Sequence, residues 1–349
     1  MNALRKSGLA MAMLFCGLAF GMIAPMAFAQ ERVKIGVSFG SLQRERWLRE
    51  WKMMEAYAKE LGNVELVVLG ADNDAMRQVA QAEEMLGQGI QALLVVAQDA
   101  EVAAAIVESA HQVNVPVIAY DRMILNADVD AYVSFNSIKV GEYMAEYLLK
   151  KYPKGNYVIL KGSKTDNNAN LVYQGQMNVL KPAIEKGDVT VAFEEWCANW
   201  SPIEAAKYAE QALQLTDKNV QAILTSSDGL AEAAVETLGQ YDLAGKVGVS
   251  GQDADVTACQ RIVEGTQTMT IYKPLASLSK AGIDTAIALI KGQQPTFNGA
   301  LNNKFKDVPA VMPEIYPVDA SNIVDVVIKS GFHPVEEVYK NLPKEQWPN

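Results

Sequence analysis

Histidine and cysteine are scarce in this chain, which has two histidines and three cysteines among its 349 residues. Neither His111 nor His333 stands beside a nucleophile or a second metal-binding residue in the sequence. A Ser–His–Asp triad and a zinc site therefore lack necessary parts. No G-x-G-x-x-G motif follows the first expected strand, so dinucleotide binding has no support. We expect no catalytic residues, no metal and no cofactor.

The three cysteines are too few for a disulfide framework. Cys16 lies near the N-terminus, where the preceding Phe15 is larger than the residue that a lipoprotein signal requires. Cys197 and Cys259 are able to pair only outside the cytoplasm. A chain of this size does not need a disulfide, and the sequence does not show whether the two cysteines meet. A disulfide and two buried free thiols therefore both remain open.

Long apolar runs are absent beyond the N-terminal segment. Arg5 and Lys6 precede an apolar run over 9–20, and Ala27-Phe28-Ala29 follows it. A positive start, an apolar centre and a small-residue site in this order are typical of a secretory signal peptide. No later stretch approaches the roughly 18 apolar residues of a membrane-spanning helix. We predict that residues 1–29 are a signal peptide and that the rest is exported and soluble.

Positive charge is in deficit, since 31 Lys and Arg residues face 41 Asp and Glu residues, a net charge of −10. The predicted signal peptide contains two of the basic residues and no acidic one, so the exported chain has a net charge of −12. Such a chain repels nucleic acids and anionic membranes. The 320 residues that follow the signal peptide favour two domains, at roughly 100–200 residues per domain.

A β-then-α alternation fills most of the chain and starts again after Phe135. Short apolar runs predict the strands, and apolar residues three and four apart predict the helices. Ser201-Pro202-Ile203-Glu204 predicts a helix start with a capping box, in which Glu204 reaches back to the N-cap residue. Apolar strands separated by helices predict parallel sheets that are covered on both faces, in two similar lobes. The expected strands are Val33–Phe39, Val64–Leu69, Ala92–Val96, Val117–Tyr120, Ala131–Phe135, Tyr157–Lys161, Val189–Phe193, Ala222–Thr225, Val247–Ser250 and Thr268–Tyr272.

Polar and aromatic residues follow many of these strands, at the sheet edge where doubly wound proteins bind ligands. Asp121 and Arg122 follow one strand, Asp253 follows another, and Lys273 comes directly after the last. Such groups donate and accept hydrogen bonds, as sugar hydroxyls require. A tryptophan ring offers a flat face for the C–H groups of a pyranose. The set indicates a small polar ligand, most simply a sugar.

Several of these residues also have ordinary structural explanations. Asp121 and Arg122 could form a turn with a local ion pair. Asp166, Asn167 and Asn168 all precede a helix, so any of them could be an N-cap. We assign Asp166 and Asn167 mainly to capping and Asn168 to the ligand.

The tryptophans present a similar choice, because only one member of each neighbouring pair is expected to face the ligand. Trp47 competes with Trp51 on one helical stripe, and Trp200 competes with Trp196. The spacing alone leaves both choices open. Between the nearby aspartates, Asp255 is better placed as a helix cap and Asp253 as a ligand group.

Several stretches along the chain resemble a known family. They are Glu45-Arg46-Trp47, residues 119–124 (AYDRMI), Asp166-Asn167-Asn168-Ala169, residues 250–255 (SGQDAD) and residues 265–270 (GTQTMT). Over nearly the whole chain, their order and number resemble the periplasmic sugar-binding proteins of ABC transporters.

The resemblance implies an α/β type I periplasmic binding protein fold, with two doubly wound parallel-sheet lobes joined by a three-crossing hinge. The crossings are expected near Phe135, Ala254 and Pro309. Residues 30–135 and 255–308 would form the N-terminal lobe, and residues 136–254 and 309–349 the C-terminal lobe.

The resemblance also implies a set of sugar-binding residues. Trp47 and Trp200 would sandwich the sugar ring. The hydroxyls would bond to Arg46, Asp121, Arg122, Asn168, Asp253 and Lys273.

Two positions depart from the family pattern. The family has Ser-Asn-Asp where this chain has Ser226-Ser227-Asp228, and the Asn bonds the sugar. Ser227 is therefore an expected ligand residue of shorter reach. Gly40-Ser41 also replaces an acidic pair. Both changes bear on which sugar is bound.

The resemblance implies a periplasmic, monomeric solute-binding component that delivers an aldopentose, D-xylose first, to a membrane permease driven by an ATPase. One rival is a sensor that presents a sugar to a receptor. Another is a sugar-processing enzyme that uses Asp121 and Asp253 as paired carboxylates. The neighbouring cations would keep both carboxylates ionised and so unsuited to act as general acids.

Overall fold

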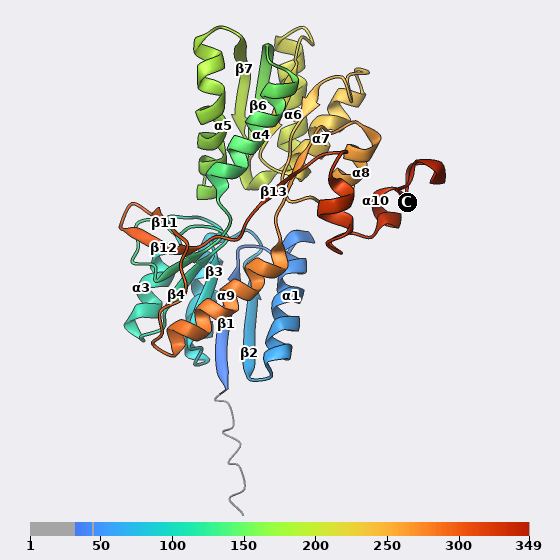
Figure 1. Ribbon diagram of the computed structural model, residues 1–349. Coiled ribbons are helices and arrows are strands. Elements are labelled where there is room, and N and C mark those ends of the chain that lie inside the picture. The colour runs from blue at the N-terminus through green and yellow to red at the C-terminus, as the bar shows by residue number, and fades with distance from the viewer. Residues whose placement is uncertain (1–31, 44, 349) are drawn as a thin grey trace, which may run out of the picture. The chain divides into compact units, whose positions relative to one another are not determined.

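The structure is a computed structural model that describes residues 32–43 and 45–348 (Figure 1). The predicted signal peptide, residues 1–29, lies outside the described residues. From residue 32 onward the chain forms a single compact unit. Among the described residues, no helix is both long enough and apolar enough to cross a membrane.

The first lobe contains a seven-stranded sheet in the order β11-β12-β5-β4-β3-β1-β2. The pairs from β2 to β12 are parallel, and β11 adds an antiparallel edge strand. The strands are β1 (Val33–Phe39), β2 (Val64–Gly70), β3 (Ala92–Val96), β4 (Val117–Tyr120), β5 (Ala131–Val133), β11 (Gly299–Asn302) and β12 (Asp307–Val311). The helices of this lobe are α1 (Glu45–Leu61), α2 (Ala75–Gly87), α3 (Ala104–Gln112) and α9 (Leu275–Ile290).

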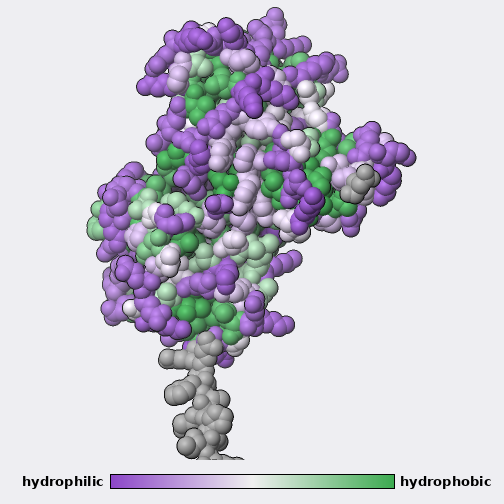
Figure 2. Space-filling view, viewed as in Figure 1, coloured by the Kyte–Doolittle hydropathy of each residue, from purple (hydrophilic) through white to green (hydrophobic). Residues whose placement is uncertain are grey.

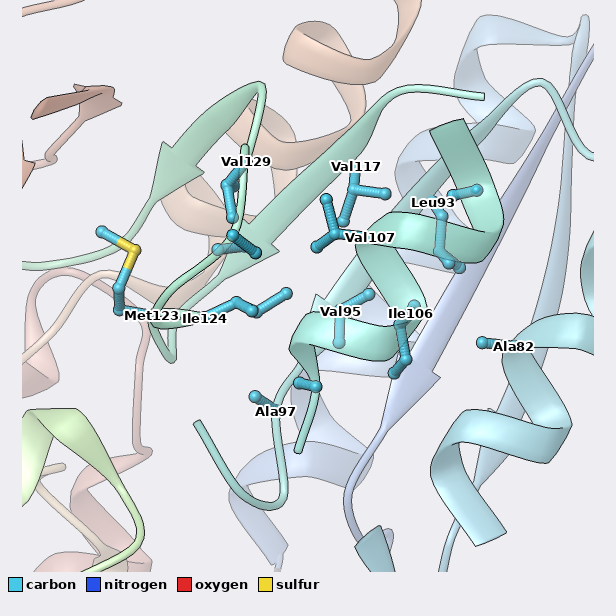
Figure 3. Close-up of a cluster of buried hydrophobic side chains, with 14 of the residues drawn as sticks. Ala82, Leu93, Val95, Ala97, Ile106, Val107, Val117, Met123, Ile124 and Val129 are labelled. Atoms are coloured by element: carbon cyan, nitrogen blue, oxygen red, sulfur yellow. The ribbon is translucent and has the colours of Figure 1, made fainter. Parts of the chain in front are cut away.

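Helices cover both faces of this sheet, which explains why its central strands are apolar throughout. Successive side chains of a strand point to opposite faces. Accordingly, Leu93 and Val95 of β3 pack in a core with Ile106 of α3, as Figure 3 shows. Leu94 and Val96 belong to the other core, beneath α1 and α9. The continuous apolar run of β3 thus reflects burial on two sides.

The second lobe contains a four-stranded parallel sheet in the order β7-β6-β8-β9. Its strands are β6 (Gly155–Lys161), β7 (Val189–Trp196), β8 (Ala222–Thr225) and β9 (Gly248–Val249). Its helices are α4 (Ser137–Lys151), α5 (Asn167–Glu185), α6 (Pro202–Leu215), α7 (Asp228–Gly239) and α8 (Val256–Glu264). Strand β10 (Thr270–Tyr272) pairs with β13 (Tyr316–Val318), and the short helix α10 (Val335–Val338) packs on α8.

The type I periplasmic binding protein fold predicted from the resemblance is confirmed, and each predicted strand is present within three residues of its expected ends. Helix α4 was not predicted. It contains Gly141 at its crossing with α5, where a Cβ atom would lie 2.0 Å from the Val172 carbonyl oxygen. Gly175 of α5 has the same relation to Ile138. These glycines, which weaken a helix pattern, allow the two backbones to touch.

The predicted lobe boundaries differ from those in the structure. The chain first leaves the first sheet after β5, between Val133 and the start of α4 at Ser137. However, α8 packs against α7 in the second lobe, and the next crossing lies between β10 and α9, not near Ala254. The last crossing follows β12, later than Pro309. The apolar periodicity of α8 does not encode which of two similar lobes the helix covers.

The predicted capping box at the start of α6 is also wrong in one bond. Ser201 caps the helix as expected, since its hydroxyl accepts from the Glu204 N–H at 3.4 Å. The Glu204 carboxylate instead accepts from the Ala198 N–H at 2.5 Å. The backbone N–H of the N-cap residue Ser201 donates to the Ala198 carbonyl oxygen at 3.0 Å, so it has another partner. On the face of the molecule that Figure 2 shows, hydrophilic side chains surround several apolar patches.

Candidate functional site

A pocket lies between the two lobes, at the carboxyl ends of their strands. Its volume is about 20 Å³, which is room for about one water molecule. The volume is small because charged side chains extend across the pocket and contact one another. Its lining comprises Arg46, Trp47, Asp121, Arg122, Ser134, Phe135, Ser137, Val140, Asp166, Asn168, Trp200, Gln252, Asp253 and Lys273. Eight of the nine predicted ligand residues are in this set.

Arg46 lies at the centre of the pocket, and its side chain is only 9% exposed. Its guanidinium contacts the Asp121 carboxylate, lies 3.2 Å from Asp253 Oδ1, and donates from Nε to Glu50 Oε1 at 2.8 Å. Burial lowers the pKa of Arg46, but the three carboxylates raise it by more, so the pKa lies well above its ordinary value. Arg46 is therefore a permanent cation, and its bond to Glu50 on the same helix holds the guanidinium in place.

Asp121 and Arg122 each bond to groups of their own lobe. Asp121 has a left-handed backbone (φ 59°), and its carbonyl oxygen accepts from Ser134 Oγ at 2.6 Å and from Tyr132 at 3.0 Å. Arg122 donates from a terminal nitrogen to the Ala97 carbonyl at 3.1 Å. A left-handed non-glycine residue stores strain, and such residues cluster at functional sites.

Trp47 lines the pocket and is 3% exposed, whereas Trp51 packs at the edge of the apolar core. The Trp47 ring lies against Phe39, with 6.1 Å between centroids. The guanidinium carbon of Arg46 lies 4.5 Å from its centroid. Trp47 is thus a flat wall of the pocket, whereas Trp51 is not among the residues that line it.

Asn168 belongs to α5 of the second lobe, but its side chain bonds to the first lobe. Its Nδ2 donates to the Asp121 carbonyl oxygen at 2.8 Å, and its Oδ1 accepts from Tyr132 at 3.2 Å. The preceding Asp166 caps α5, as predicted, by accepting from the Asn168 N–H. Asp166 also lines the pocket, which the sequence interpretation did not anticipate.

Trp200 supplies the facing aromatic surface. Asn199 and Trp200 both have left-handed backbones (φ 51° and 59°), which turn the ring into the pocket. The ring lies over Gly162, where a Cβ atom would lie only 2.5 Å from it. Trp196 points elsewhere, and its ring contacts the Lys161 ammonium at 4.6 Å from the centroid.

Asp253 and Lys273 close the second-lobe side. Lys273 Nζ lies 2.7 Å from Asp253 Oδ1 and donates to Gln252 Oε1 at 2.8 Å. Asp253 has a φ of 103°, a value that side-chain-bearing residues rarely adopt. Gln252 also lines the pocket but was not among the predicted ligand residues, although Gln252 follows the same strand as Asp253. Its location at the end of that strand could have indicated a role in the pocket.

Ser227 is the one predicted ligand residue that does not line the pocket. It is the N-cap of α7, where its hydroxyl accepts from the Leu230 N–H at 3.4 Å. Ser227 is 1% exposed. A serine side chain that caps its own helix is too short to extend beyond the helix start as well.

The two described cysteines, Cys197 and Cys259, are free and buried. Burial raises the pKa of the Cys197 thiol to about 12. Burial also raises the pKa of the Cys259 thiol, and neither cysteine is among the residues that line the pocket.

The charged residues of the pocket balance one another. Its lining includes three cations (Arg46, Arg122 and Lys273) and three carboxylates (Asp121, Asp166 and Asp253). Such a set supplies many donors and acceptors with no net charge, between two tryptophan rings. This chemistry suits a neutral ligand with several hydroxyl groups, because every buried polar group then finds a partner.

Comparison with known proteins agrees with this geometry. Residues 35–294 match the profile of the periplasmic binding protein domain. The chain belongs to this family. It is 38% identical over 91% of its length to the D-xylose-binding periplasmic protein of Escherichia coli, of which 96% is covered. Identity is 39% to the protein of the same name from Haemophilus influenzae, over 88% of this chain and 92% of the relative.

A solved structure shares the fold of this family member. It is a carbohydrate transporter solute binding protein from Chloroflexus aurantiacus in complex with D-glucose. The TM-score is 0.81 at 28% sequence identity, and the match covers 88% of this chain and 98% of the other. The pocket between the lobes thus belongs to a fold that this chain shares with proteins that bind small solutes.

Proposed function

We propose that this chain is a periplasmic solute-binding protein that holds a monosaccharide, D-xylose first, between its lobes. The charge-balanced ring of donors and acceptors between Trp47 and Trp200 supports the proposal. Relatives that are 38–39% identical are named for D-xylose. In this proposal residues 1–29 direct export and are removed, and the monomer delivers its sugar to the permease of an ABC importer without altering it.

Binding requires the polar groups of the pocket to exchange partners. Arg46 now bonds to Asp121 and lies near Asp253, which in turn contacts Lys273. A sugar entering between opened lobes inserts hydroxyls into these pairs, so that each charge keeps a partner. Charge-assisted hydrogen bonds are stronger than neutral ones, and a sugar with a misplaced hydroxyl leaves a buried charge unsatisfied. The same groups therefore provide both affinity and selectivity.

Calorimetric titration with D-xylose, D-ribose, L-arabinose, D-glucose and D-galactose tests the proposal. We expect D-xylose to bind at micromolar or lower concentration, and Trp200→Ala to abolish the binding heat. Trp347→Ala, which replaces a tryptophan outside the pocket lining, is the matched control and should bind like the wild type. If none of the five sugars produces binding heat, the monosaccharide proposal is wrong. Binding of another sugar alone would keep the site but change its substrate, with Ser227 as the first position to examine.

Two further assays test the rest of the proposal. Incubation with aryl xylosides should release no phenol, since the protein is proposed to bind its ligand without chemistry. Purified protein with sugar should stimulate the ATPase of its reconstituted permease. Release of phenol, or sugar-bound protein that leaves the permease ATPase unchanged, would contradict the corresponding part.

A further inference from the structure

Asp166 makes more contacts than a helix cap requires. Its Oδ1 accepts from the Asn168 N–H at 2.9 Å, which is the capping bond of α5. Its Oδ2 lies 2.8 Å from Arg122 Nε and accepts from Trp200 Nε1 at 3.1 Å. The Asp166 side chain is only 2% exposed. One buried carboxylate therefore contacts three of the residues that the family resemblance assigns to the sugar.

The contact with Arg122 joins the two lobes. Arg122 follows β4 in the first lobe, whereas Asp166 begins α5 in the second. Close to it, the Ala100 N–H donates to the Thr165 carbonyl at 3.0 Å, and Gln98 Nε2 donates to Asn199 Oδ1 at 3.2 Å. The Arg122–Asp166 pair joins two charges across the lobes at 2.8 Å, as does the longer Arg46–Asp253 pair at 3.2 Å.

We propose that Asp166 is a positioning residue that couples closure of the lobes to assembly of the sugar site. It orients Trp200 and the start of α5 within the second lobe, and it captures Arg122 when the first lobe arrives. The inference rests on the proposed sugar-binding function for its purpose, but the interlobe bond itself requires no sugar.

The chemistry of Asp166 is specific to a carboxylate. One oxygen serves the helix N–H, and the other serves two N–H donors, from Arg122 and Trp200. An asparagine amide has a single acceptor oxygen. Asp166→Asn can keep the cap, since asparagine caps helices as well as aspartate. Its NH₂ group then faces the two N–H donors, and the interlobe ion pair is lost.

A matched control exists in the first lobe. Asp74 caps α2, and its Oδ1 accepts from the Met76 and Arg77 N–H groups at 2.9 and 3.0 Å. Asp74 is exposed. Asp74→Asn therefore makes the same change at a helix start that has only the capping role.

The test measures the distance between the lobes without sugar. Met76→Cys and Ile203→Cys, at exposed positions on α2 and α6, carry spin labels in the exported chain, whose native Cys197 and Cys259 are buried. Asp166→Asn should shift the distance distribution to longer values, and Asp74→Asn should leave it as in the wild type. Identical distributions for Asp166→Asn and Asp74→Asn would overturn the proposal. Because no sugar is added, failure of the proposed function does not decide this result.

Affinity and a second variant complete the test. If the chain binds sugar, Asp166→Asn should weaken binding by about 10- to 100-fold, as expected when a buried charge loses its partner. Asp74→Asn should change the affinity less than about twofold, since it only exchanges one good cap for another. Should Asp166→Asn fail to fold, Arg122→Met removes the same pair from the other side and should also lengthen the distance. An Arg122→Met distribution equal to the wild type contradicts the interlobe role.

Discussion

The two sides of the pocket are built differently. On the first-lobe side, Arg46 is fixed by Glu50 of its own helix, and Arg122 by the Ala97 carbonyl. On the second-lobe side, both polar atoms of Asn168 bond to first-lobe residues. The first lobe therefore presents a formed half-site. In the second lobe Asp253 already contacts Lys273, but the amide of Asn168 finds these partners only when the lobes meet. A sugar should dock on the first lobe and be enclosed by the second, which shifts the equilibrium toward closure.

The largest predicted effect comes from the formed half-site. Asp121→Ala removes the carboxylate that contacts Arg46 and leaves that buried cation short of a partner. Truncating one member of a buried charge pair typically costs several kcal/mol, so we expect D-xylose affinity to fall about 100-fold or more. Calorimetry measures the loss. A change of less than about threefold would refute the role of this half-site.

A smaller and kinetically distinct effect is predicted for the second lobe. Asn168→Ala removes bonds that exist only between the lobes, so the docking step on the first lobe should be unaffected. We expect about tenfold weaker binding, expressed in the dissociation rate with little change in the association rate. Stopped-flow tryptophan fluorescence separates the two rates. A slowed association with unchanged dissociation would reverse the proposed order of events.

Gly162→Ala tests how Trp200 is held in the second lobe. The new methyl group would lie 2.5 Å from the ring, so the ring must move. Displacement of one aromatic wall should weaken sugar binding about three- to tenfold, since aromatic contacts are worth about 0.5–1.5 kcal/mol beyond their area. Gly187→Ala, at a site with no neighbouring atom within 4 Å, controls for a methyl group as such, although its left-handed backbone lowers stability. Equal affinity for Gly162→Ala and the wild type would show that the ring position is unimportant.

Glu50 provides the smallest predicted effect, on stability rather than binding. Burial raises the pKa of Glu50, partly offset by Arg46. A carboxyl with a raised pKa in the folded state contributes its full stability below the unfolded pKa of about 4.3, and loses it as the pH rises toward the folded value. Wild-type protein should therefore lose unfolding free energy relative to Glu50→Gln as the pH rises above about 4.3. Urea denaturation at several pH values measures this difference, and a difference that is constant with pH contradicts it.

Much of the fold was predictable because buried parallel strands are apolar on both faces. Segments such as Ala92–Val96 therefore stand out as short apolar runs. The lobe to which α8 belongs was not predictable, since an amphipathic helix has the same period on either lobe. Helix α4 was missed because Gly141, which breaks the helical pattern, is required for its contact with α5.

The site was predictable in its residue types but not in all of its roles. Position after a strand indicated Asp121, Asp253 and Lys273, and the family resemblance separated Trp47 and Trp200 from their neighbours. Asp166 and Asp74 have the same local capping pattern, so the sequence alone does not distinguish them. Only the arrival of Arg122 from the other lobe gives Asp166 its second role. Ser227 shows the converse, since its short side chain serves the cap of α7.

The most direct test of the account is the distance between labels at Met76→Cys and Ile203→Cys, measured with and without D-xylose. The account predicts that saturating D-xylose collapses the distribution onto its shortest component in the wild type. Asp121→Ala should require a far higher sugar concentration for the same change. If D-xylose binds by calorimetry while the distance distribution stays the same, the sugar is not enclosed between the lobes, and the account is wrong.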